Sequence, residues 1–150
     1  MKKLLVLGLI ILFTANSFAQ WKVQNVDNGF DKPYKIAYTE DGQAEYLKLE
    51  NYKGIAFYIG GVYVCDESVT VDISFLVNGT YKKYFTTGDV SDNHKIVFIV
   101  DDINTDVNFL ADFKAASSVK IRIHDTTCDT EIYEFKMTGS TAAYNAVSIQ

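Results

Sequence analysis

The chain has 150 residues, with 14 basic and 19 acidic side chains and a net charge of −5 at neutral pH. Such an acidic chain is poorly suited to neutralising phosphates, which argues against nucleic-acid binding and against adsorption to anionic lipid. Aromatic residues make up 14% of the chain, proline occurs once and β-branched residues come in runs, so we expect a folded, mostly β protein.

Residues 1–19 have the pattern of a cleaved secretory signal peptide. Lys2 and Lys3 form a positive start, an apolar run follows at 4–13, and small residues precede the cleavage site. The run is too short to span a bilayer, which needs about 20 residues. We therefore expect a mature chain, 20–150, that lies in the periplasm or outside the cell and is not an integral membrane protein. We expect these residues to form one domain. Without the two lysines, the mature chain has 12 basic and 19 acidic side chains, a net charge of −7.

Sequence periodicity predicts about eight β-strands in the mature chain. In chain order the expected strands cover residues 33–40, 44–50, 55–61, 69–77, 80–85, 95–100, 119–125 and 131–137. Asn78-Gly79 is a strong turn signal because both residues tolerate the positive φ of a type I′ turn, so the strands on either side form a hairpin. Segments 55–61 and 95–100 are apolar on both faces, which indicates strands covered on both sides.

Two further segments have helical periodicity. Phe109 and Phe113 are four residues apart, with Asn104 or Thr105 as the expected N-cap. The alanine-rich segment 139–148 is a second short helix or turn. About eight short strands with one or two short helices predict an antiparallel β-sandwich or compact β-barrel. Its core is expected to contain one apolar face of several strands and the two helix phenylalanines: Val71, Ile73, Phe75, Ile96, Phe98, Val100, Ile121, Ile123, Phe135, Phe109 and Phe113.

The C-terminal part of the chain resembles the end of small secreted bacterial β-sandwich proteins. A helix ending in FKAAS is followed by the strand VKIRI, a turn, the strand YEFKM and then TGSTAAYNAV, within about residues 105–148. The invasion-associated locus B family and accessory proteins of type VI secretion are examples of this group. The resemblance implies a sandwich architecture and an envelope location, and it carries over no catalytic residues.

The two cysteines, Cys65 and Cys128, are expected to form a disulfide, because an exported protein meets an oxidising compartment. The bridge would close a loop of about 60 residues and contribute about 4 kcal/mol of stability. A free nucleophilic thiol is a further interpretation, but it requires an activating base and a pocket that the sequence does not identify.

Zinc binding is an alternative use of the cysteines, since His124 lies four residues before Cys128. The carboxylates that could complete the ligand set are Asp66, Asp125 and Asp129. Strand alternation, however, places His124 on the polar side of its strand together with Lys120 and Arg122, which argues against a zinc site at this position.

A second candidate metal site is the segment DDINTDVN at 101–108. Asp102, Asn104 and Asp106 stand at alternate positions, as in the opening of a calcium-binding loop. Val107 occupies the place of the required glycine, and Phe113 that of the final glutamate. The other interpretation is a loop between a strand and a helix, in which these side chains cap the helix.

Three strand tyrosines, Tyr58, Tyr81 and Tyr84, are candidates for ligand contact, because tyrosine on a rigid β-surface suits contacts with sugars or proteins. The sequence contains no G-x-S-x-G elbow. We expect a non-catalytic binding or envelope-interaction module whose partner is a protein or glycan of the cell envelope. No cofactor is expected, apart from calcium in the first alternative below. The alternatives are a calcium-dependent adhesion or carbohydrate-binding module and a small secreted hydrolase with a site near His124.

Overall fold

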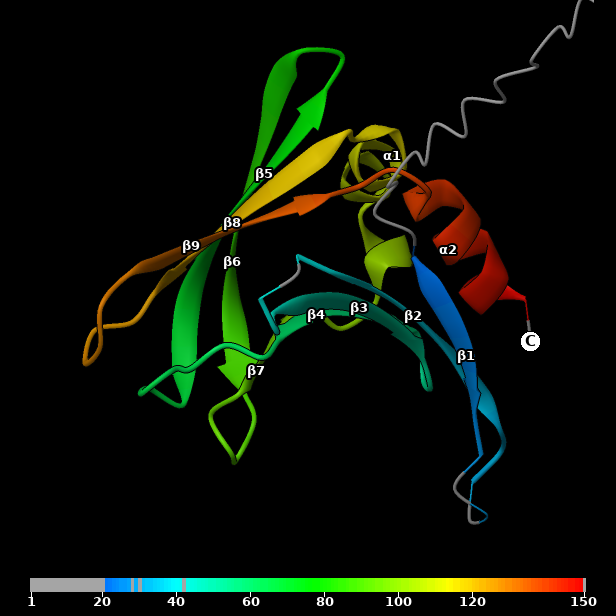
Figure 1. Cartoon of the computed structure of the whole chain (residues 1–150), viewed down its shortest axis with the longest axis horizontal. Helices are drawn as coiled ribbons and strands as arrows, with labels where there is room; N and C mark the ends of the chain where they lie inside the picture. The colour runs from blue at the N-terminus through cyan, green and yellow to red at the C-terminus, as the bar shows by residue number, and fades with distance from the viewer. Residues whose placement is uncertain (1–20, 28, 30, 42, 150) are drawn as a thin grey trace, which may run out of the picture.

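The computed structural model describes residues 21–149 except 28, 30 and 42, so the expected signal peptide lies outside the described residues. Figure 1 shows a strongly curved sheet with two helices beside it. The elements in chain order are β1 (Lys22–Val26), β2 (Tyr34–Glu40), β3 (Tyr46–Asn51), β4 (Ile55–Gly60), β5 (Ser68–Val77), β6 (Thr80–Val90), β7 (Ile96–Val100), the 3₁₀ helix η1 (Ile103–Thr105), α1 (Val107–Ala115), β8 (Ser118–His124), β9 (Glu131–Lys136) and α2 (Ser140–Ser148).

The nine strands of the described part of the chain belong to one antiparallel sheet in the order β1-β2-β3-β4-β7-β6-β5-β8-β9. The prediction of a mostly β, antiparallel protein with short helices is confirmed, but the described residues form neither the two separate sheets of a sandwich nor a closed barrel. The reason is the short β6–β7 pairing at Asp89↔Phe98 and Val90↔Val97, which joins the two halves of the sheet. β1 and β9 remain its edges.

The core lies on one side of the bent sheet and is shared by both halves. Phe57 of β4 and Phe75 of β5 both pack their rings edge-on against Phe113 of α1, with centroids 5.5 and 6.2 Å apart. β2 and β9 approach each other as well. The bend therefore lets one sheet enclose a core as two sheets would, with α1 and α2 covering its open end.

The predicted core is correct for β5, β8, β9 and α1 but wrong for β7. Ile96, Phe98 and Val100 were expected inside, whereas the structure buries Val97 and Ile99 and leaves Phe98 38% exposed. β7 is apolar at every position, so its sequence has no alternation that identifies the inner face. The pairing with β4, which shifts register at a bulge, selects that face.

The helix ends differ in detail from the prediction. α1 is capped by Asp106, whose Oδ1 accepts the backbone N–H groups of Asn108 and Phe109 at 2.9 and 3.0 Å, and not by Asn104 or Thr105. The expected Asn78-Gly79 turn is confirmed, with φ of 49° and 76°.

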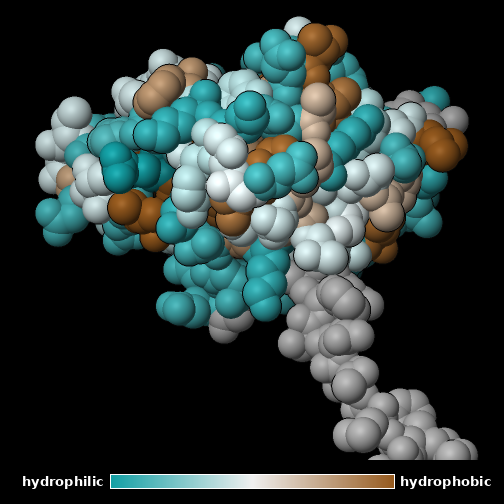
Figure 2. All heavy atoms as spheres, turned by 90° about the horizontal axis from the view of Figure 1, so that it is seen from above, coloured by the Kyte–Doolittle hydropathy of each residue, from teal (hydrophilic) through white to brown (hydrophobic). Residues whose placement is uncertain are grey.

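Within the described part of the chain, no helix is long and apolar enough to cross a membrane. Figure 2 shows the molecule from above, relative to the view in Figure 1. The face seen there is mostly hydrophilic, and its apolar residues lie in separate patches. That face therefore lacks the continuous apolar surface that is typical of large obligate interfaces.

Candidate functional site

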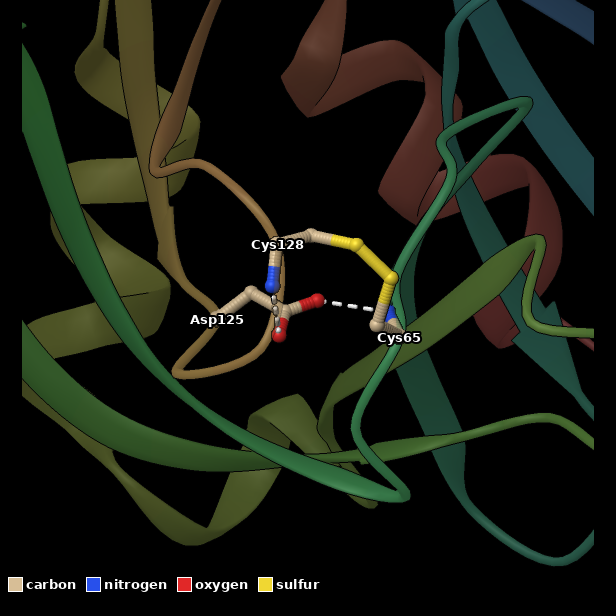
Figure 3. A group of neighbouring side chains, drawn as sticks. All are labelled: Cys65, Asp125 and Cys128. Carbon is tan, nitrogen blue, oxygen red and sulfur yellow. Dashed lines mark hydrogen bonds between the residues drawn. A yellow bond between two sulfur atoms is a disulfide. The ribbon is translucent and has the colours of Figure 1, made fainter.

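The predicted disulfide between Cys65 and Cys128 is present, with Cα atoms 5.8 Å apart. Figure 3 shows the Asp125 carboxylate beside the bridge. Its oxygens accept the backbone N–H groups of Cys65, Thr127 and Cys128. Burial alone would raise the pKa of Asp125, but these three amides outweigh burial and hold the pKa below its ordinary value. The carboxylate thus ties the segment before β5 to the β8–β9 loop, independently of the disulfide.

A second aspartate reinforces the same connection. Asp66 accepts hydrogen bonds from the backbone N–H and hydroxyl of Thr126 and from the hydroxyl of Thr127. These bonds, led by the two hydroxyls, hold the pKa of Asp66 well below its ordinary value. Asp66 and Asp125 are therefore structural in this geometry, because their oxygens are occupied by loop donors.

The zinc alternative does not fit this arrangement. Ligand atoms of Cys65, Asp125 and Cys128 lie within 4.8 Å of one another, but the two sulfurs are bonded to each other and cannot act as thiolate ligands in this state. His124 points elsewhere, with Nε2 2.9 Å from Asp72 Oδ2. As predicted, His124 lies on the outer face of β8 with Arg122, whose Nη1 is 3.6 Å from the same carboxylate oxygen.

For a hydrolase near His124, the histidine should be hydrogen-bonded to a nucleophile as well as to an orienting carboxylate. Asp72 occupies the position of the orienting group. Among the described residues, the His124 ring has no hydrogen bond to a serine, threonine or cysteine. The structure therefore supplies the histidine and its orienting carboxylate, but among the described residues it places no nucleophile within hydrogen-bond distance of His124.

The three residues of the calcium prediction lie along one loop but have separate roles. Asp102 caps η1 by accepting the backbone N–H and side-chain amide of Asn104, and it also accepts the backbone N–H of Ile55. Asp106 caps α1. The Asn104 side-chain oxygen accepts the hydroxyl of Tyr144 at 2.6 Å. Helix capping by the two aspartates and the Tyr144 hydrogen bond to Asn104 account for these oxygens, and calcium binding stays a prediction.

The structure does not bring the three candidate tyrosines together. Tyr58 lies on the outer face of β4 and is only 3% exposed. Tyr81 is exposed on the outer face of β6, in the other half of the sheet. Tyr84 is half-buried on the core side, where its hydroxyl donates to Asp112 at 2.6 Å and its ring packs against Phe109.

Instead, Tyr58 belongs to an aromatic row that the sequence analysis did not identify. Register places Tyr38, Lys48, Tyr58 and Phe98 side by side across β2, β3, β4 and β7. The Lys48 ammonium lies 4.8 Å from the Tyr58 ring centroid, and the Tyr58 and Phe98 centroids are 5.2 Å apart. We call the outer surface formed by this row and the adjacent Tyr46 the aromatic face.

Gly60 allows Tyr46 to lie flat on this face. The two residues are direct neighbours in the β3–β4 register, and a Cβ added to Gly60 would lie 2.2 Å from the Tyr46 ring. The ring therefore covers the glycine beside Tyr58. In Figure 1, β2, β3 and β4 form an arch, and both helices lie on its convex side. Because the helices cover the core, the aromatic face, which is the opposite side of these strands, lines the concave side of the arch.

The charges on the aromatic face neutralise each other. Glu50 Oε2 is 2.8 Å from the Lys48 ammonium and also accepts the Tyr58 hydroxyl. Burial would raise the pKa of Glu50, but the hydrogen bonds from Lys48 and Tyr58 outweigh it and lower the pKa. Burial, followed by the neighbouring Glu50, raises the pKa of Tyr58 far above its ordinary value. The face thus presents neutral phenols and a satisfied ion pair.

A shallow depression of about 400 Å³ adjoins the aromatic face at Phe98. Carboxylates and hydroxyls surround it, among them those of Asp89, Asp101 and Thr87. Asp89 is the direct register neighbour of Phe98. An exposed aromatic ring and several hydrogen-bond acceptors therefore meet at the β6–β7 junction.

Sequence reasoning missed Phe98, Lys48 and Asp89 as site residues. Phe98 was assigned to the core because its strand is apolar throughout, and the juxtaposition of these residues depends on the β4–β7 and β6–β7 registers. No protein-family model, curated protein or solved structure matches the chain. The resemblance of residues 105–148 to small secreted bacterial proteins stays a prediction from the sequence.

Proposed function

We propose that this protein is an exported, non-catalytic binding module that takes a neutral carbohydrate chain on the aromatic face. The observation that carries the proposal is the position of Phe98. Phe98 is 38% exposed and stands at the β7 end of the aromatic row, where it also lines the acceptor-rich depression. The periplasm or the cell exterior, where envelope glycans occur, is the expected location.

The chemistry of the surface favours a sugar over other ligands. Aromatic rings pack against the C–H faces of a sugar ring, and carboxylates and hydroxyls accept hydrogen bonds from its hydroxyl groups. Asp89 and Asp101 supply such acceptors beside Phe98. Their negative charge, together with the Lys48–Glu50 pair that leaves no free cation in the row, disfavours an acidic ligand.

Packing within the row would keep the binding surface preorganised. Tyr58 is fixed between Lys48 and Phe98, and its hydroxyl is held by Glu50. Little side-chain entropy is therefore lost when a ligand binds. A small, open surface of this kind should bind single oligosaccharides weakly, with a dissociation constant on the order of 0.1–1 mM.

The test is a titration of the isotope-labelled protein with linear hexasaccharides of glucose, mannose and N-acetylglucosamine, followed by NMR. We expect saturable shifts of β4 and β7 amides with at least one of them. Phe98→Ala should weaken binding by about tenfold or more. The matched control is Phe85→Ala, which removes an equally large exposed ring from the outer face of β6.

Two results would contradict the proposal. The first is the absence of saturable shifts with all three sugars at about 10 mM, well above the expected dissociation constant. The second is equal weakening by Phe98→Ala and Phe85→Ala. Repeating the titration with EDTA and with added calcium tests the calcium-dependent alternative, in which binding disappears with the chelator.

A further inference from the structure

The outer face of β6, β5, β8 and β9 has a charge pattern that the proposed carbohydrate site does not use. Two rows of outward side chains cross these four strands in register. The first row, in the order β6-β5-β8-β9, is Phe85, Asp72, Arg122 and Ile132. The second row is Lys83, Ser74, Lys120 and Glu134. We call this surface the charged face; it surrounds a shallow depression of about 540 Å³.

We propose that the charged face binds a second copy of this chain, forming a two-fold symmetric dimer whose axis runs parallel to the strands between β5 and β8. With this axis, each row of side chains lies opposite the same row of the partner. The order of the strands across the sheet is reversed in the partner. β6 then faces β9 of the second copy, and β5 faces β8. Isologous contacts of this kind are the commonest arrangement in soluble homodimers.

The first row is complementary to its own reversed copy. Phe85 faces the partner's Ile132, and Asp72 faces the partner's Arg122. Phe85 and Ile132 are 71% and 58% exposed and are among the largest apolar side chains that the described surface leaves open. Symmetry repeats each contact, so apolar groups meet at both ends of the row and opposite charges meet in its centre.

The second row is complementary in the same way. Lys83 faces the partner's Glu134, and Ser74 faces the partner's Lys120. Within one copy, Lys83 and Glu134 are separated by two intervening strands, about 14 Å of sheet. They can therefore form an ion pair only between copies.

Other two-fold arrangements of the same face are unfavourable. An axis centred on β8 would place Arg122 against the partner's Arg122, and an axis centred on β5 would oppose Asp72 to the partner's Asp72. An axis perpendicular to the strands, passing along the second row, would oppose Lys83 to the partner's Lys83. Opposition of like charges is a strong penalty against a wrong pairing, so the charge pattern favours the axis between β5 and β8 over these three.

The charges on this face are available for contacts between copies. The Arg122–Asp72 and Lys120–Glu134 distances within one copy are 3.6 and 3.8 Å, and the cations are nearly half exposed. Exposed ion pairs of this type contribute little to folding, typically about 0–1 kcal/mol. Among the described residues, Lys83 has no ion-pair partner. Asp72 also contacts His124 Nε2 at 2.9 Å, so the partner's Arg122 adds to an existing cluster around this carboxylate.

The expected affinity follows from the size of the face. The next outward row in the same register is Tyr81, Leu76, Ser118 and Lys136. Strands about 4.8 Å apart and outward residues about 6.7 Å apart give roughly 400 Å² per copy over these three rows. Stable interfaces use about 800 Å² per partner. We therefore expect a weak dimer with a dissociation constant of about 10–100 µM. Because its pairs lie near the surface, it should weaken as salt shortens the screening length.

Sedimentation equilibrium of the purified protein over about 5–500 µM, at low and high salt, measures this association. Lys83→Glu should weaken the dimer about tenfold or more, since the new glutamate faces the partner's Glu134. Glu134→Lys should do the same by facing the partner's Lys83. The matched control is Lys82→Glu, which makes the same charge change on the neighbouring exposed residue, whose side chain lies on the opposite side of β6.

Mixing the two weakened variants gives the decisive result. In the mixed pair, both contacts between positions 83 and 134 join opposite charges again, so a heterodimer should form at concentrations where each variant alone is a monomer. A misfolded variant could not regain association in this way. The proposal is overturned by a wild-type protein that remains monomeric at 500 µM, by a dimer equally sensitive to Lys82→Glu, or by variants that do not associate when mixed.

Discussion

Removal of the disulfide should cost the fold about 4 kcal/mol. Cys65 and Cys128 are 63 positions apart, and in the chain-entropy model a crosslink over that distance restricts the unfolded chain by this amount. For a domain of about 130 residues, the loss corresponds to a fall of about 16 °C in melting temperature. The variant Cys65→Ala/Cys128→Ala should show it in urea and thermal denaturation, while its circular dichroism spectrum stays native.

The fold should survive because Asp125 keeps the same two segments together through three backbone hydrogen bonds. Wild-type protein treated with a reducing agent is the control and should reproduce the stability of the double variant. A loss below about 1 kcal/mol would refute the reasoning, because the bridge would then add nothing beyond the Asp125 contacts. Two free thiols in the intact mass of alkylated, non-reduced protein would show that the bridge does not form.

Three other substitutions test the core, the ion pair and the helix cap. Phe75→Ala should lose about 4 kcal/mol in urea denaturation because its side chain is fully buried among helix and strand rings, while Phe85→Ala, 71% exposed, should change stability by less than about 0.5 kcal/mol in dilute protein. The pKa of Glu50 is lower in the folded protein, so its contribution is complete above its unfolded pKa of about 4.3 and disappears as pH falls through the lower folded pKa. The stability difference between wild type and Glu50→Gln should therefore shrink from about pH 5 toward pH 2, and a difference that grows toward acid would contradict this assignment. Asp106→Ala should lose about 1 kcal/mol through the lost N-cap, equally with calcium and with EDTA; a calcium-dependent loss would instead favour the calcium loop.

The local parts of the fold were predictable because neighbouring residues determine them. Alternation identified the buried face of β5, and Asn78-Gly79 identified its hairpin with β6. The single sheet was not predictable, because β4 pairs with β7 and β5 with β8 across long stretches of sequence. The inner face of β7 was not predictable either. Five consecutive apolar residues fit either orientation, and only packing against β4 chooses Val97 and Ile99 for the core.

The same limit explains the candidate sites. Alternation correctly placed His124 outward with Arg122, because a strand's period alone decides which face a residue occupies. It could not show what covers that face. Tyr58 points outward as its position suggests, yet Lys48 and Phe98 from neighbouring strands bury it. The environment of a surface residue thus depends on cross-strand neighbours, which become known only with the register.

The two proposals reinforce each other because the aromatic face and the charged face belong to different halves of a bent sheet. A dimer through β6, β5, β8 and β9 leaves the row on β2, β3, β4 and β7 uncovered in both copies. A carbohydrate polymer long enough to reach both rows would then be held at two points. Linking two weak sites raises the overall affinity by about a hundredfold or more when the geometry allows simultaneous contact. Lys83→Glu should therefore weaken binding to a long polysaccharide while leaving hexasaccharide affinity unchanged, whereas Phe98→Ala should weaken both. Equal effects of Lys83→Glu on short and long sugars would show that dimerisation and carbohydrate binding are not coupled in this way.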